Sequence, residues 1–177
     1  VAATRALYGI ASPNPTILGL KHALAGLTVT VALGVAMSVA LGWSLNLPLL
    51  QLADIHLGWG FVGWGVVLLA AVAYVVVPMF QITPAYPDWF SRRFSVAALT
   101  AAALWTIAEW LDWSVASTAL GALVVGLAAL FAAITLAVQR GSKRARFDAT
   151  QHYWRGAMLS ALAAGVLWLA AHTLALV

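Results

Sequence analysis

The sequence predicts an all-α integral membrane protein, a bundle of about five transmembrane helices. Of its 177 residues, 64% are hydrophobic and only 8% are charged, whereas about a quarter are charged in a typical soluble domain. The apolar residues form runs long enough to cross a bilayer, which takes about 20 residues at about 1.5 Å each. No segment alternates apolar and polar residues over about ten positions, so we do not expect a membrane β-barrel.

Five apolar runs define the predicted helices, which together form a single domain over residues 1–177. The first helix ends before a break at 42–48 that contains glycine and proline. The second begins with Asp54 as its N-cap and ends before the prolines at 84 and 87. The predicted ranges are about 16–41, 54–79, 92–111, 113–139 and 152–177.

The charged residues predict the orientation of the bundle. With five spans, all nine basic residues lie on one side of the membrane, and the other side carries Asp54, Glu109 and Asp112. The positive-inside rule makes the basic side cytoplasmic, which puts the N-terminus in the cytoplasm and the C-terminus outside. The net charge of +4 therefore reflects topology, and nucleic acid is not an expected partner. The basic residues are Arg5, Lys21, Arg92, Arg93, Arg140, Lys143, Arg144, Arg146 and Arg155.

Several kinds of site are excluded by what the sequence lacks. There is no cysteine, so disulfides and thiolate metal sites are excluded, and histidine, methionine and carboxylates remain as possible ligands. A Gly-rich phosphate loop, a nucleophile elbow and a His-Glu-x-x-His motif are all missing. We therefore predict no catalytic residues of a hydrolase or a kinase.

The four histidines are the candidate cofactor-binding residues, and their predicted depth sorts them into two pairs. His22 and His152 lie near the cytoplasmic ends of the first and fifth helices. His56 and His172 lie toward the outer ends of the second and fifth. Two imidazoles at one depth on different helices are what a bis-histidine haem requires, and a metal ion between helices needs a similar arrangement. The alternative for each is a simple hydrogen bond to a neighbouring helix or to water.

His56 opens a glycine-rich run on the second helix. At about 100° per residue, Gly60 and Gly63 lie on the same helix face as His56. This puts an imidazole above a groove that has no side chains, where a flat cofactor has room. Small residues also recur at every fourth position of the first helix from Gly26 to Gly42. Close packing of neighbouring helices is the alternative explanation for both patterns.

Two strings carry a family resemblance, His56-Leu-Gly-Trp-Gly-Phe-Val-Gly-Trp-Gly and Tyr74-Val-Val-Val-Pro-Met-Phe-Gln-Ile-Thr-Pro-Ala-Tyr-Pro. Over 54–87 the chain resembles uncharacterised proteobacterial multi-pass proteins, which are similar to the haem-copper oxidase catalytic subunit and to the NnrS family. The resemblance implies a respiratory-type helical fold in the bacterial cytoplasmic (inner) membrane, with haem b or copper held by a histidine at the head of a helix. Such relatives are longer, so the resemblance implies that this chain corresponds to their C-terminal half.

Three functions are then expected, all with the lipid bilayer as a partner. The leading hypothesis is a membrane haem or metal protein that transfers electrons or senses a diatomic gas, with His56 and His172 as metal ligands. At most this implies an oxidoreductase-like activity. The alternative is a cofactor-free accessory subunit that docks against other membrane subunits or a second copy of itself. A transporter is third, because the midplane parts of the predicted helices carry no ionisable residue.

Overall fold

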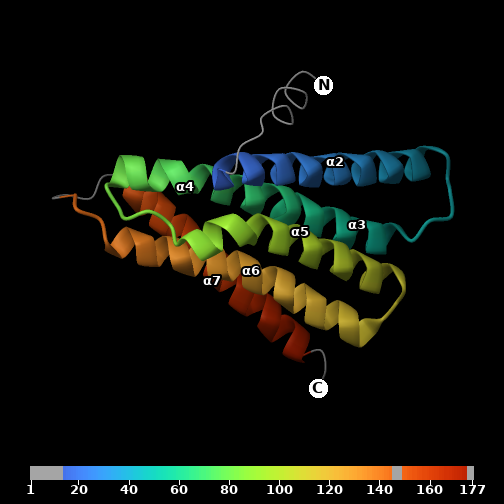
Figure 1. The fold of residues 1–177 in the computed structure, drawn as a ribbon. Coiled ribbons are helices and arrows are strands. Elements are labelled where there is room, and N and C mark those ends of the chain that lie inside the picture. Colours follow the sequence, from blue (N-terminus) through green and yellow to red (C-terminus); the bar gives the residue numbers. More distant parts are fainter. Residues whose placement is uncertain (1–13, 145–148, 175–177) are drawn as a thin grey trace.

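The computed structural model describes residues 14–144 and 149–174, and within these ranges every regular element is a helix (Figure 1). The all-α prediction is therefore confirmed. Three elements, α3, η1 and α4, follow one another without a break and form the second predicted helix. The elements are α2 (Pro15–Gly42), α3 (Leu49–Gly58), the π-helix η1 (Trp59–Val66), α4 (Val67–Gln81), α5 (Asp88–Trp110), α6 (Ser114–Arg140) and α7 (Ala149–Leu174).

Within the described ranges, four helices are long and apolar enough to cross a membrane, and they span Pro15–Gly42, Leu49–Gln81, Ser114–Arg140 and Ala149–His172. The third predicted span, which corresponds to α5, is less apolar because it carries four charged residues and several hydroxyl groups. It also contacts α2, α3, η1, α4 and α6, and it buries Ser91 and Ser95. The buried face of α5 can place these polar groups against protein, where they cost less than against lipid, while its other face, which includes Val96 and Leu104, is exposed.

The second helix begins five residues earlier than predicted, at Leu49 directly after Pro48. Asp54 lies inside α3, so its predicted role as the N-cap is wrong. The apolar run already includes Leu49, Leu50 and Leu52, and Pro48 occupies the cap position without a side-chain hydrogen bond. The carboxylate of Asp54 is consequently available for other contacts.

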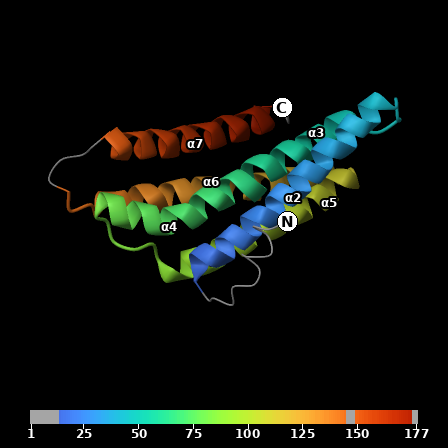
Figure 2. The same ribbon diagram turned by 90° about the horizontal axis from the view of Figure 1, so that it is seen from above.

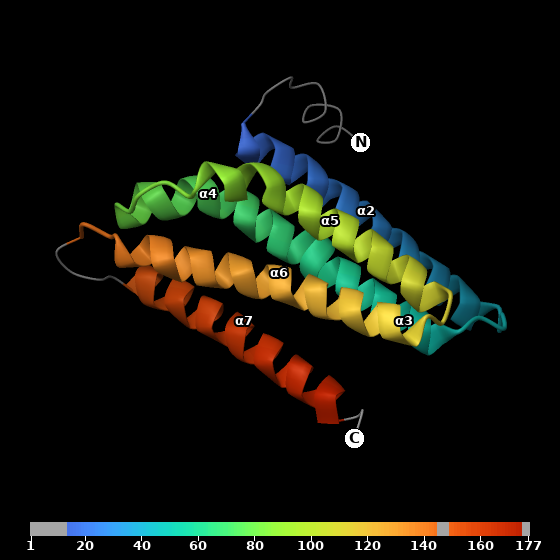
Figure 3. The same ribbon diagram turned by 60° about the horizontal axis from the view of Figure 1, so that its bottom comes forward.

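Successive helices run in opposite directions. α2 and α7 lie on opposite sides of the bundle (Figures 2 and 3). The continuous α3–η1–α4 unit, α5 and α6 lie between them. The core contains a chain of aromatic rings, in which Phe90 lies 4.9 Å from Phe94 and Phe94 lies 5.8 Å from Phe131 between ring centroids. α7 packs mainly against α6, which leaves much of its surface uncovered.

Because the helices alternate in direction, the described basic residues gather at the end of the bundle where α2 begins, toward the left of Figure 1. Arg5 and Arg146 lie outside the described residues. The opposite end carries Asp54, Glu109 and Asp112. We call these the basic end and the acidic end.

Buried polar contacts join the connections at the basic end. The amide of Gln139 donates to the side-chain oxygen of Gln81 over 2.9 Å, and both residues are fully buried. Tyr86, in the loop after α4, donates to the hydroxyl of Thr135 over 3.1 Å. Burial raises the pKa of Tyr86 to about 12, although this hydrogen bond acts in the opposite direction. Tyr86 is therefore a neutral donor at ordinary pH.

Candidate functional site

A seam of very close backbone contact joins α2 to the second helix. A Cβ atom at Gly26 would collide with the carbonyl group of Gly63, and one at Gly19 would lie 2.7 Å from the Cβ of Ala71. Separations this short occur only where small residues face each other, as in other membrane helix pairs. The ridge of small residues on α2 is thus used for helix packing.

His56 belongs to this seam. Its Nδ1–H donates to the backbone carbonyl of Thr30 over 3.0 Å. A Cβ atom at Gly34 would lie 3.2 Å from Cε1 of His56, so the missing side chain at Gly34 makes room for the imidazole. This geometry agrees with the alternative interpretation of His56, a simple hydrogen bond to the neighbouring helix.

The space beside Gly60 and Gly63 is filled by protein. A Cβ atom at Gly60 would lie 3.4 Å from the methyl group of Thr30 on α2. One at Gly63 would lie 2.7 Å from the ring of Trp59, while the carbonyl of Gly63 faces Gly26. The prediction that these glycines leave a groove for a flat cofactor is therefore wrong for this arrangement. The seam runs through the π-helix η1, a form with i→i+5 hydrogen bonds that is rare in proteins.

His22 and His152 do not form a pair. Nδ1 of His22 lies 2.9 Å from the hydroxyl of Ser95 on α5, which joins α2 to α5. His152 is exposed on α7, and α2 and α7 lie on opposite sides of the bundle (Figure 2). Similar predicted depth does not make two helices neighbours.

His172 lies away from the seam, against a cavity at the acidic end. Its ring stacks on Trp168 with centroids 3.8 Å apart and 24° between the planes. Its Nδ1–H donates to the carbonyl of Trp168 over 2.9 Å. His56 does not line this cavity, so the predicted pairing of His56 with His172 around one cofactor is wrong.

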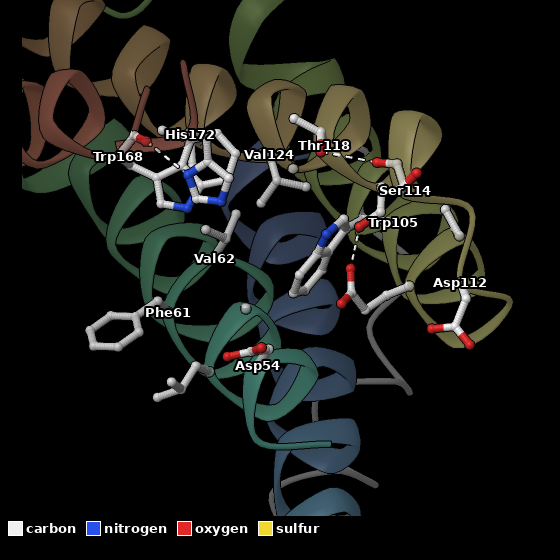
Figure 4. A pocket seen from close by; sticks show the side chains of 17 residues that line it. Asp54, Phe61, Val62, Trp105, Asp112, Ser114, Thr118, Val124, Trp168 and His172 are labelled. Atoms are coloured by element: carbon white, nitrogen blue, oxygen red, sulfur yellow. Dashed lines mark hydrogen bonds between the residues drawn. The ribbon is translucent and has the colours of Figure 1, made fainter. Parts of the chain in front are cut away.

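The cavity has a volume of about 840 Å³ and lies between α3–η1 on one side and α5, α6 and α7 on the others (Figure 4). Trp105 and Trp168 form aromatic walls. Gly121 lies between them, since a Cβ atom there would be 3.2 Å from Trp168 and 3.4 Å from Trp105. Cavities of this size, mostly apolar with a few polar groups, are typical of small-molecule sites.

Three carboxylates line the same cavity. Asp54 is exposed on α3, whereas Glu109 accepts a hydrogen bond from Ser117 at the start of α6. Asp112 lies in the tight α5–α6 turn, with φ of 54°, and accepts from the amide of Gln51 over 3.3 Å. No described lining residue is a lysine or an arginine, so the three carboxylates dominate the charge of the cavity, beside the indole N–H groups of Trp105 and Trp168.

The sequence singles out some of these residues but not the cavity. Asp54, Glu109 and His172 are recognisable as polar residues near one predicted membrane boundary. Trp105 and Gly121 give no such signal, because a tryptophan and a glycine inside apolar runs are ordinary. Among the described residues, His, Asp and Glu nowhere gather in groups of three or more that could hold a metal ion.

We predict that His56→Ala lowers stability and affects no ligand. The change removes one hydrogen bond between helices and the packing of a ring at Gly34, a loss of about 1 kcal/mol. Thermal unfolding in detergent measures it, with His152→Ala as the control because His152 is exposed and outside the seam. Loss of a cofactor absorption band in His56→Ala without a fall in Tm would contradict the packing role.

His172 therefore lies at the best candidate site, with aromatic walls on one side and carboxylates on the other. The remaining predicted residues, His56, His22, Gly60 and Gly63, contact neighbouring helices instead. No known protein family, curated protein or solved structure matches this chain.

Proposed function

We propose that the cavity at the acidic end binds a lipophilic molecule whose polar head donates hydrogen bonds, the chemical class to which quinols belong. The observation that carries this proposal is the combination of tryptophan walls with three carboxylates and an imidazole, and with no lysine or arginine among the described lining residues. A quinol has a flat ring, two hydroxyl donors and an apolar tail. Its hydroxyls match these acceptors, and its ring matches the aromatic surfaces.

His172 supplies one of the acceptors. A carbonyl oxygen can only accept, so the contact with Trp168 requires the proton of neutral His172 to be on Nδ1. Nε2 then carries a lone pair. Stacking on Trp168 fixes the orientation of the ring. In this form Nε2 of His172 can accept a hydrogen bond from a hydroxyl of a bound ligand but cannot donate one to a carbonyl.

We further infer that all five helices cross a bacterial cytoplasmic membrane with the basic end inside. Although α5 is less apolar than the others, its 23 residues make it about 35 Å long, enough for the hydrocarbon layer of about 30 Å. The positive-inside rule supports the orientation. The cavity then lies near the outer surface of the membrane. Cysteine-accessibility labelling of single-cysteine variants at Ser44 and Lys143 tests this orientation.

The binding test is a titration of the purified chain with decylubiquinol and, separately, with decylubiquinone, followed by tryptophan fluorescence. We expect saturable quenching by the quinol and binding at least about tenfold weaker by the quinone, since the quinone has no hydroxyl that can donate to the carboxylates or to His172. His172→Ala is expected to weaken quinol binding by about tenfold. Gly121→Leu fills the space between Trp105 and Trp168 and is expected to abolish binding.

His152→Ala is the matched control, because it removes an imidazole from the same helix outside the cavity. Equal affinity for quinol and quinone would contradict recognition of donors. Quinol binding that survives Gly121→Leu would put the ligand at another place on the protein.

Haem is a second candidate, and one specific contact favours it. Ligating histidines usually donate their other ring N–H to a carbonyl or carboxylate, as His172 does to Trp168. A haem brings four nitrogens of its own, so a single imidazole is enough, whereas a bare copper ion needs several protein ligands. His172 would hold the iron, but no described lining residue is a lysine or arginine that could pair with the propionates.

The spectrum of the purified protein, air-oxidised and dithionite-reduced, separates the two candidates. A haem band that His172→Ala removes and His56→Ala keeps would support the haem function. If the protein is colourless and does not bind quinol, a cofactor-free accessory subunit becomes the leading function. The poorly covered surface of α7 would then be the surface that meets other subunits or a second copy.

A further inference from the structure

The basic end carries a second hollow, on the outer face of the bundle between α5 and α6. It has a volume of about 450 Å³, and the two helices that form it run side by side (Figure 1). Arg92 and Arg93 lie at one end of it. The rest of the lining is apolar except for one threonine: Val96, Ala97, Thr100, Ala101, Leu104, Leu123 and Leu127. We call this the arginine-headed groove.

The groove is uncovered within the described part of the chain. Val96, Leu104 and Leu123 keep 46%, 48% and 49% of their surface exposed. In a membrane-spanning bundle this surface meets lipid chains. The groove is therefore a place where a lipid can lie along the protein.

The length of the groove matches one leaflet of a bilayer. Eleven residues separate Arg93 from Leu104, which is about 16 Å along α5. Half of a hydrocarbon layer of about 30 Å is about 15 Å. An acyl chain that begins at Arg93 would therefore reach the midplane at Leu104.

At the head of the groove, no described residue neutralises the positive charge. Asp88 lies one turn before Arg92 on α5, yet among the described residues neither Arg92 nor Arg93 has its guanidinium in an ion pair or a hydrogen bond. Guanidinium groups bind phosphate through two parallel hydrogen bonds. Exposed Trp89, one turn before the arginines, is the kind of residue found at the level of lipid head groups.

We propose that the arginine-headed groove is a binding site for one anionic phospholipid of the cytoplasmic leaflet, with its phosphate at Arg92 and Arg93 and an acyl chain along α5 and α6. The charge of the head and the apolar length below it select a lipid over a free phosphate. The proposal does not depend on the ligand of the cavity at the acidic end.

The test is native mass spectrometry of the detergent-released chain titrated with dioleoyl-phosphatidylglycerol and, separately, dioleoyl-phosphatidylcholine. We expect one phosphatidylglycerol to bind in preference to phosphatidylcholine. In Arg92→Gln/Arg93→Gln the affinity for phosphatidylglycerol should fall by roughly 30-fold, because each basic residue contributes about 1 kcal/mol near an anionic surface and about 1.4 kcal/mol is tenfold.

Two further variants make the test specific. Arg140→Gln/Lys143→Gln removes the same charge at the same end but outside the groove, so its affinity should stay within about threefold of the wild type. Ala97→Trp blocks the groove without changing charge and should abolish binding. An equal loss in both double variants, equal binding of phosphatidylcholine, or retained binding in Ala97→Trp would each overturn the proposal. Glycerol 3-phosphate that competes as well as the lipid would show a phosphate site only.

Discussion

Gly26→Ala is expected to destabilise the folded bundle severely. The added methyl group would overlap the backbone carbonyl of Gly63, and a backbone group cannot rotate away as a side chain can. Overpacking of cores costs about 1–3 kcal/mol where side chains can adjust. Here α2 itself has to move, which also breaks the hydrogen bond between His56 and Thr30. We expect a loss of about 3 kcal/mol or more.

Gly126→Ala is the matched control for this experiment. It makes the same chemical change within a long helix of the bundle, yet a Cβ atom at Gly126 meets nothing within 4 Å. We expect its stability to stay within about 1 kcal/mol of the wild type, and to rise if helix propensity dominates. Size-exclusion chromatography and thermal unfolding in detergent measure both variants. A Gly26→Ala protein as stable as Gly126→Ala would show that the two helices are not in backbone contact.

The second large effect is expected at the buried glutamine pair of the basic end. Gln139→Leu removes the donor to Gln81 and leaves the side chain of Gln81 buried without that partner. A buried polar group that loses its hydrogen bond costs about 1–3 kcal/mol, so we expect a loss of about 2 kcal/mol. Gln81→Leu should cost a similar amount, since it leaves the amide of Gln139 without an acceptor.

The double variant Gln81→Leu/Gln139→Leu distinguishes a hydrogen-bond loss from a packing defect. Replacing both partners with apolar groups of similar shape is often nearly neutral. We therefore expect the double variant to be no less stable than either single variant, as measured by unfolding in detergent. Losses that simply add would mean that the two amides contribute independently through packing.

Much of the fold could be predicted from the sequence, because helix spans depend on the order of apolar and polar residues along the chain. A run of about 20 apolar residues is visible without knowing what packs on it, and most predicted helix ends lie within four residues of the observed ones. The early start of α3 at Leu49 shows where this reasoning is weak. An acidic residue such as Asp54 has the chemistry of an N-cap, but only the surrounding apolar run decides whether a helix begins there.

The sequence by itself determined the helical class, the apolar spans and the gathering of basic residues at one end, because these follow from order along the chain. Only the tertiary structure decided which faces meet. His56 reaches Thr30 because facing glycines let α2 approach the second helix, and that approach closes the space in which a cofactor was expected. His172 lines a cavity because α7 packs on α6 and leaves Trp168 facing Trp105 across Gly121. Which helices pack together depends on how well their surfaces fit, and each pair of fitting surfaces comes from residues far apart in the chain.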